Sequence, residues 1–229
     1  MDILSNTFDS RYGTAFGNVL TSESLRQRAP AVFASAAHER TSAQYTFIPT
    51  EKVLDGLMGA AFVPVDARQA RSRRASPQHG RHVVRLRRRY ETVQLRDAIP
   101  EIVFLNSHDG TSAYQLRMGL HRVVCTNGLI VSQGAFRSIR VAHRGDVVDE
   151  VVAGALAMAE GFLGLAAQVE RMEQMHLDED QQLQLAQRAL SVRYPHVAEA
   201  GLHSSQLLSC RREADAGSDL WSVFNRIQL

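Results

Sequence analysis

The stretch Glu101–Val131, EIVFLNSHDGTSAYQLRMGLHRVVCTNGLIV, carries the densest patterning in the chain. An apolar run, a turn at Asp109-Gly110, an alternating run and a second turn at Asn127-Gly128 follow one another. Asp-Gly and Asn-Gly favour type I′ turns, whose two central residues both need positive φ. The stretch therefore predicts a three-segment antiparallel meander.

A second hairpin is expected upstream of this stretch. Phe62–Arg74 and Arg81–Tyr90 have strand-like sequences and flank the turn residues Ser76–Gly80. In the second strand, a period of two places the following residues on one face: Arg81, Val83, Arg85, Arg87 and Arg89. Further strands are expected over His121–Thr126, Leu129–Ser132 and Phe136–His143, although Leu116–Cys125 could instead begin as a helix.

Helical patterns lie on both sides of the predicted strands. A short helix before Pro30 and a helix starting at Thr50, with Thr50 as its N-cap, precede them. Apolar residues spaced by three and four then predict a long helix over Val147–Met175. The last helices are expected over Asp178–Tyr194, Ser204–Arg212 and Asp219–Ile227, the last capped by Ser218 or Asp219.

These elements predict an α+β protein. An antiparallel sheet of hairpins, over about 62–143, follows a short N-terminal helix and precedes an all-helical C-terminal part. The expected divisions are an irregular arm over 1–45, an antiparallel α+β domain with a basic hairpin over 46–145, and a helical region over 146–229. That helical region would pack either on the sheet or on a neighbouring subunit.

Composition points to a cytoplasmic globular protein. No apolar run approaches the roughly 20 residues of a membrane span, and the N-terminus lacks a cationic segment followed by an apolar one. The two cysteines, Cys125 and Cys210, fall in different segments and are expected to be reduced. No cofactor is expected, because neither GxxxxGK[ST] nor GxGxxG occurs.

Positive charge is concentrated between Arg68 and Arg96, where ten arginines accompany one acid, Glu91, in a chain of formal net charge +2. Like charges directly opposite each other destabilise a sheet, so this ladder suggests a polyanionic partner. A solvated edge hairpin protected against aggregation is the alternative. Tyr90 or Tyr114 could stack on bases, and the residues predicted to contact nucleic acid are Arg71, Arg73, Arg74, Arg81, Arg85, Arg87, Arg89 and Tyr90.

Cys125 and His121 invite an enzymatic interpretation, because a cysteine nucleophile needs a base within hydrogen-bond reach. On an extended strand the two residues would lie about 13 Å apart, which is too far for a direct pair. Neither the CxxC, the HxH nor the HExxH spacing occurs, so no metal site is expected. The polar turn Asn106–Gly110 is expected to be structural, because its side chains can bond to their own backbone.

Three segments resemble the plasmid- and phage-borne proteins grouped as domain of unknown function 932. They are Asn106-Ser107-His108-Asp109-Gly110, Arg122-Val123-Val124-Cys125-Thr126-Asn127-Gly128-Leu129, and Leu220-Trp221-Ser222-Val223-Phe224-Asn225-Arg226-Ile227-Gln228. The resemblance implies location on mobile genetic elements but no established activity. Family members usually continue beyond the last motif, so this chain resembles a short or truncated member.

A similarity of topology and charge, rather than of motif, links the chain to single-strand annealing recombination mediators. The first hypothesis is therefore a non-enzymatic binder of single-stranded DNA that anneals complementary strands and forms oligomers. The second is an anti-restriction or other interaction protein that contacts a host protein. The third is an enzyme using Cys125 with His108 or His121, and none of the three involves a membrane.

Overall fold

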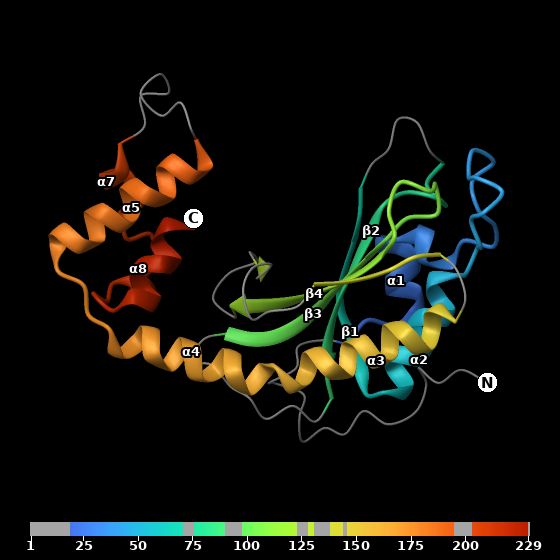
Figure 1. Cartoon of the computed structure of the whole chain (residues 1–229), viewed down its shortest axis with the longest axis horizontal. Coiled ribbons are helices and arrows are strands. Elements are labelled where there is room, and N and C mark those ends of the chain that lie inside the picture. The colour runs from blue at the N-terminus through green and yellow to red at the C-terminus, as the bar shows by residue number, and fades with distance from the viewer. Residues whose placement is uncertain are drawn as a thin grey trace. The chain divides into compact units, whose positions relative to one another are not determined.

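The computed structural model describes residues 19–70, 76–89, 98–122, 128–130, 138–143, 146–194 and 203–228. The chain forms two compact units, Met1–Phe162 and Leu163–Leu229, coloured from blue to gold and from gold to red in Figure 1. The first unit holds the sheet and the second is helical. The α+β class expected from the sequence is confirmed.

The first unit contains one antiparallel sheet in the order β1-β2-β3-β4-β5, with β6 also paired to β4. Its strands are β1 (Phe62–Gln69), β2 (His82–Arg88), β3 (Ala98–Asn106), β4 (Tyr114–Arg122), β5 (Gly128–Ile130) and β6 (Ser138–Val141). β5 pairs with β4 at Gly119–His121 and β6 pairs with it at Tyr114–Arg117. The predicted meander is therefore present, and its edge is extended by β6.

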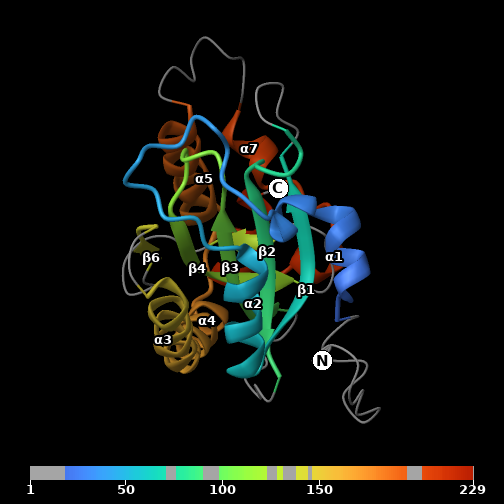
Figure 2. The same cartoon turned by 90° about the vertical axis from the view of Figure 1, so that its right-hand side faces the viewer.

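Strand alternation separates an apolar face of the sheet from a polar one. In β2, His82, Val84 and Leu86 have no exposed surface, whereas Arg85 alternates with them on the other face. The apolar face is covered by α2 (Thr50–Gly59) and α3 (Val147–Glu160), which lie in front of the strands in Figure 2. The core lies between these helices and the sheet.

Two glycines set how closely the helices approach. A Cβ added at Gly56 of α2 would lie 2.8 Å from Val148 Cγ1 of α3. A Cβ added at Gly154 of α3 would lie 2.9 Å from Ile139 Cδ1 of β6. Because these positions lack a side chain, α3 packs tightly both on α2 and on the β4–β6 edge.

The segment before α2 lies along β1. Helix α1 (Ser22–Arg28) is capped by Thr21, and a 3-10 helix follows at Pro30–Phe33. The backbone N–H of Leu20 donates to the Pro64 carbonyl at 2.8 Å, and the N–H of Ala31 donates to Gln69 Oε1 at 2.8 Å. These bonds cover the outer edge of β1.

Several local predictions need correction. The β3–β4 connection is longer than a two-residue turn, and of its residues only Gly110 has positive φ, at 77°, so it is not a type I′ turn. The segment from Leu116 to Arg122 is strand rather than helix. Pro49 occupies the N-cap of α2, and the Thr50 hydroxyl bonds elsewhere.

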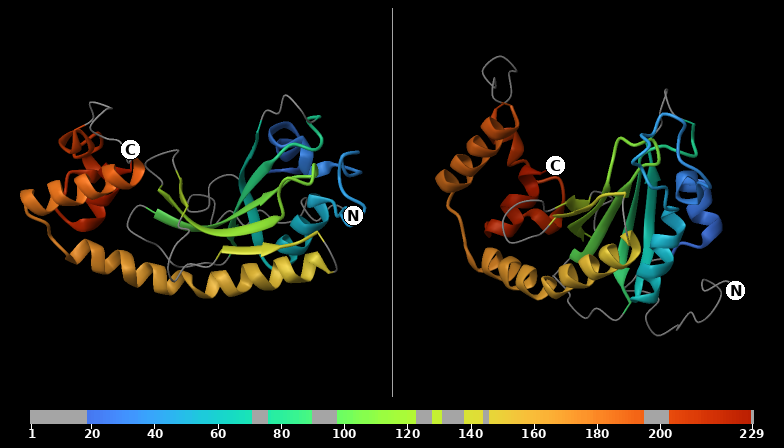
Figure 3. Two further views of the ribbon diagram at one scale, coloured as in Figure 1. Left: turned by 45° about the horizontal axis from the view of Figure 1, so that its top comes forward. Right: turned by 45° about the vertical axis from the view of Figure 1, so that its right-hand side comes forward.

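The second unit consists of short helices. It includes most of α4 (Phe162–Gln174), together with α5 (Glu179–Arg193), α7 (Ser204–Leu207), a 3-10 turn (Glu213–Asp215) and α8 (Leu220–Ile227). Asp178 caps α5 in a capping box, a cap that was not predicted. Asp219, one of the two residues expected to cap α8, is its N-cap, and α7 is shorter than predicted. Figure 3 shows orange α5 beside red α8, where Arg226 Nη2 donates to Gln182 Oε1 at 3.0 Å.

Helices α3 and α4 together form a 28-residue helical stretch, Val147–Gln174, that is long and apolar enough to cross a membrane. It is the one described helix that meets these two criteria. Core helices of soluble proteins meet the same criteria, and the Val147, Val151 and Ala155 side chains of α3 are fully buried. Length and composition alone are therefore weak evidence for a membrane segment.

Candidate functional site

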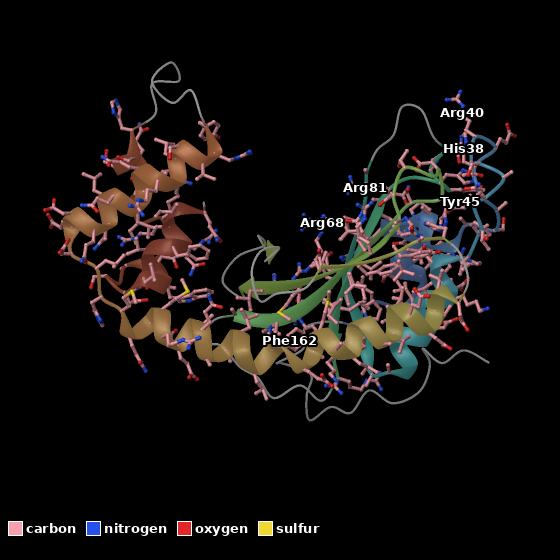
Figure 4. The ribbon with its side chains drawn as sticks, in the orientation of Figure 1. His38, Arg40, Tyr45, Arg68, Arg81 and Phe162 are labelled. Atoms are coloured by element: carbon pink, nitrogen blue, oxygen red, sulfur yellow. The ribbon has the colours of Figure 1, made fainter. Side chains whose placement is uncertain are left out.

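The sheet face opposite α2 and α3 carries charged side chains from five strands, β1 to β4 and β6. We call it the polar face and define it by the strand residues that project from it. They are Val63, Asp66, Arg68, Val83, Arg85, Arg87, Ile99, Glu101, Val103, Leu105, Gln115, Arg117, His121, Ser138 and Arg140. Arg81 lies two residues before Val83 and projects to the same side as Arg68 (Figure 4).

The centre of the polar face is a buried carboxylate held by two arginines. Arg85 Nε donates to Glu101 Oε2 at 2.6 Å, and Arg87 Nε donates to Glu101 Oε1 at 2.7 Å. Glu101 is only 1 % exposed and Arg87 only 7 % exposed. Two of the arginines predicted to contact phosphate are thus engaged by an internal carboxylate.

A second carboxylate, Asp66, forms salt bridges with three guanidinium groups. The Asp66 oxygens lie 3.1 Å from Arg28 Nη1, 3.3 Å from Arg68 Nε and 3.4 Å from Arg85 Nη1. The Arg68 side chain remains 70 % exposed and that of Arg28 52 % exposed. Counting charges over Arg68–Arg96 overstated the positive charge of this face. The carboxylates of Asp66 and Glu101, which neutralise part of it, lie just outside that stretch of sequence.

His121 lies on β4 beside this network. Burial lowers the pKa of its imidazole, Glu101 and Asp66 raise it, and Arg85 and Arg87 lower it. The net effect on His121, dominated by burial, is a pKa below the ordinary histidine value. Its predicted partner Cys125 lies outside the described residues, so the cysteine–histidine pair has no described geometry.

Two arginines on the polar face were missed by the sequence analysis. Arg117 of β4 donates through Nη2 to Gln115 Oε1 at 3.1 Å, and Arg140 of β6 is exposed. The alternation of apolar and polar residues along β4 could have placed Arg117 on the polar face. Arg140 reaches this face only because β6 pairs with β4, which no local pattern predicts.

The remaining predicted contact residues are distributed unevenly. Arg81 is exposed just before β2, and Arg89 is exposed just after it, with its backbone N–H bonded to the Ala61 carbonyl at 2.7 Å. Four further predicted residues lie outside the described part of the chain: Arg71, Arg73, Arg74 and Tyr90. The prediction of Tyr114 as a stacking platform is wrong, because its ring is fully buried and its hydroxyl donates to the Ile48 carbonyl at 2.6 Å.

The loop predicted as a family motif belongs to a buried polar cluster. The Thr50 Oγ1 atom lies 2.9 Å from His82 Nε2, 3.1 Å from His108 Nε2 and 3.0 Å from Asn106 Nδ2. All four residues, Thr50, His82, Asn106 and His108, have no exposed surface. The cluster therefore joins the start of α2 to β2 and to the end of β3.

The hydrogen bonds assign the protons in this cluster. His82 Nδ1 donates to the Gly80 carbonyl at 2.9 Å, so its Nε2 accepts from the Thr50 hydroxyl. The Thr50 oxygen then accepts from Asn106 and from His108 Nε2–H. Burial lowers the pKa of His82 to about 4, and burial together with neighbouring histidines lowers that of His108 to about 3, so both rings are neutral.

The rest of the motif stabilises the β3–β4 connection. Asp109 Oδ1 accepts from Ser107 Oγ at 2.7 Å, from the Thr111 N–H at 3.0 Å and from Thr111 Oγ1 at 2.6 Å. Burial favours the protonated carboxyl, but these bonds hold the pKa of Asp109 below its usual value. The side chains of Asn106, Ser107 and Asp109 thus hydrogen-bond within this connection and to Thr50, and a structural role for the motif stays a prediction.

The other motif residues are divided between the two units. Arg122 and Gly128 end β4 and begin β5, whereas Cys125 and Asn127 lie outside the described residues. In the second unit, Trp221 is buried in α8 and Asn225 Nδ2 donates to its carbonyl at 2.7 Å. Within the described ranges, no group of three or more histidine, cysteine or acidic side chains could hold a metal ion.

Comparisons with known proteins identify the family of the chain. The family described as Domain of unknown function (DUF932) matches residues 37–228, and the chain belongs to that family. UPF0380 protein YafZ and UPF0380 protein YfjQ of Escherichia coli (strain K12) are each 39 % identical to it over 224 residues. Each alignment covers 96 % of this chain and 81 % of the relative. No solved structure matches the chain.

Proposed function

We propose that this protein is a non-enzymatic nucleic-acid-binding protein that holds single-stranded DNA on the polar face. The observation that carries the proposal is that, among the described residues, seven arginines from separate elements and two carboxylates lie on or beside the polar face. Those arginines are Arg28, Arg68, Arg81, Arg85, Arg87, Arg117 and Arg140, and the carboxylates are Asp66 and Glu101. The excess of positive charge suits a polyanion.

The charges of the polar face have two roles in this proposal. Arg85 and Arg87 are bonded to Glu101, so they order the centre of the face rather than reach outward. Arg68, Arg81 and Arg140 are exposed and could contact phosphates directly. This division keeps the sheet stable despite its many like charges, because each buried guanidinium has a carboxylate partner.

The breadth of the face favours a single strand over a duplex. The strands β1 to β4 with β6 span about 19 Å at the usual spacing of about 4.8 Å between neighbours. The DNA major groove is only about 12 Å wide and admits a helix or a two-stranded ribbon. A flexible single strand can instead lie across a broad sheet.

Phosphate contacts should dominate the affinity. On the polar face, the only aromatic ring among the residues of β1 to β4 and β6 is the imidazole of His121. Binding should therefore depend steeply on salt, with little contribution from base stacking. We extend the proposal to one activity. The protein, as an oligomer, would anneal complementary strands for a plasmid or phage.

The test is fluorescence anisotropy of a labelled single-stranded oligonucleotide across a salt series, with the matching duplex alongside. Preferential, salt-sensitive binding of the single strand is expected. A variant with Arg68 and Arg81 changed to alanine should bind more weakly, whereas Arg40→Ala should not, since Arg40 lies on the loop before α2 (Figure 4). Absence of binding at low salt would overturn the proposal and favour a host-protein partner.

A further inference from the structure

Five residues of the polar face form one continuous row across the sheet. Strand register pairs each residue with the next, in the order Arg68, Val83, Leu105, Gln115, Arg140. Directly paired residues of an antiparallel sheet project to the same side with their Cβ atoms about 5 Å apart. The row therefore runs perpendicular to the strands and has an arginine at each end.

This row contains no carboxylate, unlike the two rows that follow it on one side. The next row consists of Asp66, Arg85, Val103, Arg117 and Ser138. Beyond it, Arg87 contacts Glu101, which is paired with Gly119. Both of these rows carry a carboxylate, whereas the first row carries none. At its β1 end the first row still contacts one, because Asp66 Oδ2 lies 3.3 Å from Arg68 Nε. A phosphate above the β6 end, several strands away, would lie farther from Asp66 and meet less repulsion from it.

The two ends of the row are reinforced by further arginines. At one end Arg81 lies on the same side of the hairpin as the exposed Arg68 (Figure 4). At the other end Arg117 directs Nη2 to Gln115 Oε1, 3.1 Å away, so its guanidinium leans from its own row into the first one. Gln115 is held in turn, because its Nε2 donates to Ser112 Oγ at 3.2 Å.

We propose that single-stranded nucleic acid crosses the sheet along this row, perpendicular to the β-strands. This inference rests on the proposed function and specifies the path of the strand. Arg68 and Arg81 hold phosphates at the β1–β2 end, and Arg117 and Arg140 hold them at the β4–β6 end. Between them lie the half-buried Val83 and the buried Leu105 and Gln115, which are 7 % and 8 % exposed, so the strand contacts the sheet chiefly through the arginines at the two ends. The carboxylate-containing rows border the path on one side.

The path predicts that β6, far from the arginine-rich hairpin in sequence, contributes to binding. We would compare Arg68→Ala, Arg140→Ala and the double variant of the full chain by anisotropy with labelled oligothymidine. Each single change should weaken binding roughly fivefold at low salt. Each should also lower the salt slope by about 0.7, and the double variant by about 1.4.

Further variants and a folding check show whether weaker binding comes from the lost positive charge or from a disturbed fold. Arg140→Lys keeps the positive charge and should retain most of the salt slope. Arg40→Ala removes an exposed arginine from outside the row and should bind like the wild type. Circular dichroism of all variants should be unchanged, because the Arg68 and Arg140 side chains are exposed.

The outcomes distinguish this inference from the proposed function. If the wild type binds, and Arg68→Ala weakens binding while Arg140→Ala does not, the strand follows the β1–β2 hairpin instead and the crossing path is wrong. If neither change weakens binding, the row is also excluded, although the protein still binds nucleic acid. If the wild type itself does not bind, the proposed function fails and the path fails with it.

Discussion

On the polar face of the sheet, Arg87 Nε lies 2.7 Å from Glu101 Oε1. Glu101 is almost completely buried. Arg85 occupies the other oxygen of the same carboxylate at 2.6 Å. Such an arrangement is costly to break, because removing one partner leaves buried charge without compensation. Glu101 is therefore a structural requirement of the polar face.

Replacing Glu101 with glutamine should destabilise the first unit by about 3 kcal/mol, since two arginines would then face a neutral amide. Urea denaturation followed by circular dichroism measures this change. Asp66→Asn is the matched control and should cost about 1 kcal/mol or less, because Arg28 and Arg68 are largely exposed to water. Equal losses for the two variants would contradict the assigned role of Glu101.

Replacing Thr50 with valine should destabilise the protein by about 2–4 kcal/mol. The two side chains have nearly the same shape, but valine leaves His82, His108 and Asn106 without the hydroxyl that they share. Each buried polar group without a partner costs about 1–3 kcal/mol. Thr50→Ser keeps the hydroxyl and should lose much less, so a serine variant as unstable as the valine variant would point to packing instead.

Stability should fall as the pH decreases below about 6.5. His82 and His108 stay neutral in the folded protein because their pKa values are lowered to about 4 and about 3, whereas the unfolded chain takes up protons near the ordinary histidine value of 6.5. The unfolded state therefore binds more protons in this range. The free energy of unfolding should fall by up to about 1.4 kcal/mol per pH unit for each ring.

Urea denaturation at a series of pH values from 7.5 to 4.5 measures that slope. His82→Gln provides the comparison, because glutamine cannot titrate. This variant is expected to be less stable at every pH but to have a shallower dependence on pH. A slope identical to that of the wild type would exclude His82 as a source of the effect.

Local patterns predicted those features that depend on local physics. Alternation of buried and polar residues placed Arg85 and Arg87 on one face of β2, and the acidic residues at Asp178 and Asp219 marked two helix starts. Strand register is different, because it depends on which distant segments pair. Only that pairing brings Glu101 into contact with Arg87 and places Arg140 in the same row as Arg68.

Contacts between distant segments also explain why the predictions for Thr50 and Tyr114 were wrong. Thr50 has the residue type of an N-cap, but its hydroxyl is bonded to two histidines that lie 32 and 58 residues away. Tyr114 looked available for stacking, but alternation in β4 turns it into the core, against Phe104 and His143. In both cases tertiary contacts outweigh the local preference.

Gly154 should be intolerant of larger side chains, because its backbone is in close contact with the sheet edge. An added Cβ would lie 2.9 Å from Ile139 Cδ1 and 3.3 Å from Leu116 Cδ1. Gly154→Val should therefore destabilise the first unit by about 1–3 kcal/mol through overpacking, even though valine has the higher helix propensity.

Gly164 of α4 is the matched control, since a Cβ added there meets no described atom within 4 Å. Gly164→Val should be neutral or slightly stabilising, by about 0.4 kcal/mol, because only helix propensity changes. Thermal unfolding of both variants provides the comparison. If Gly154→Val were as stable as Gly164→Val, α3 could not lie as close to β4 and β6 as the structure places it.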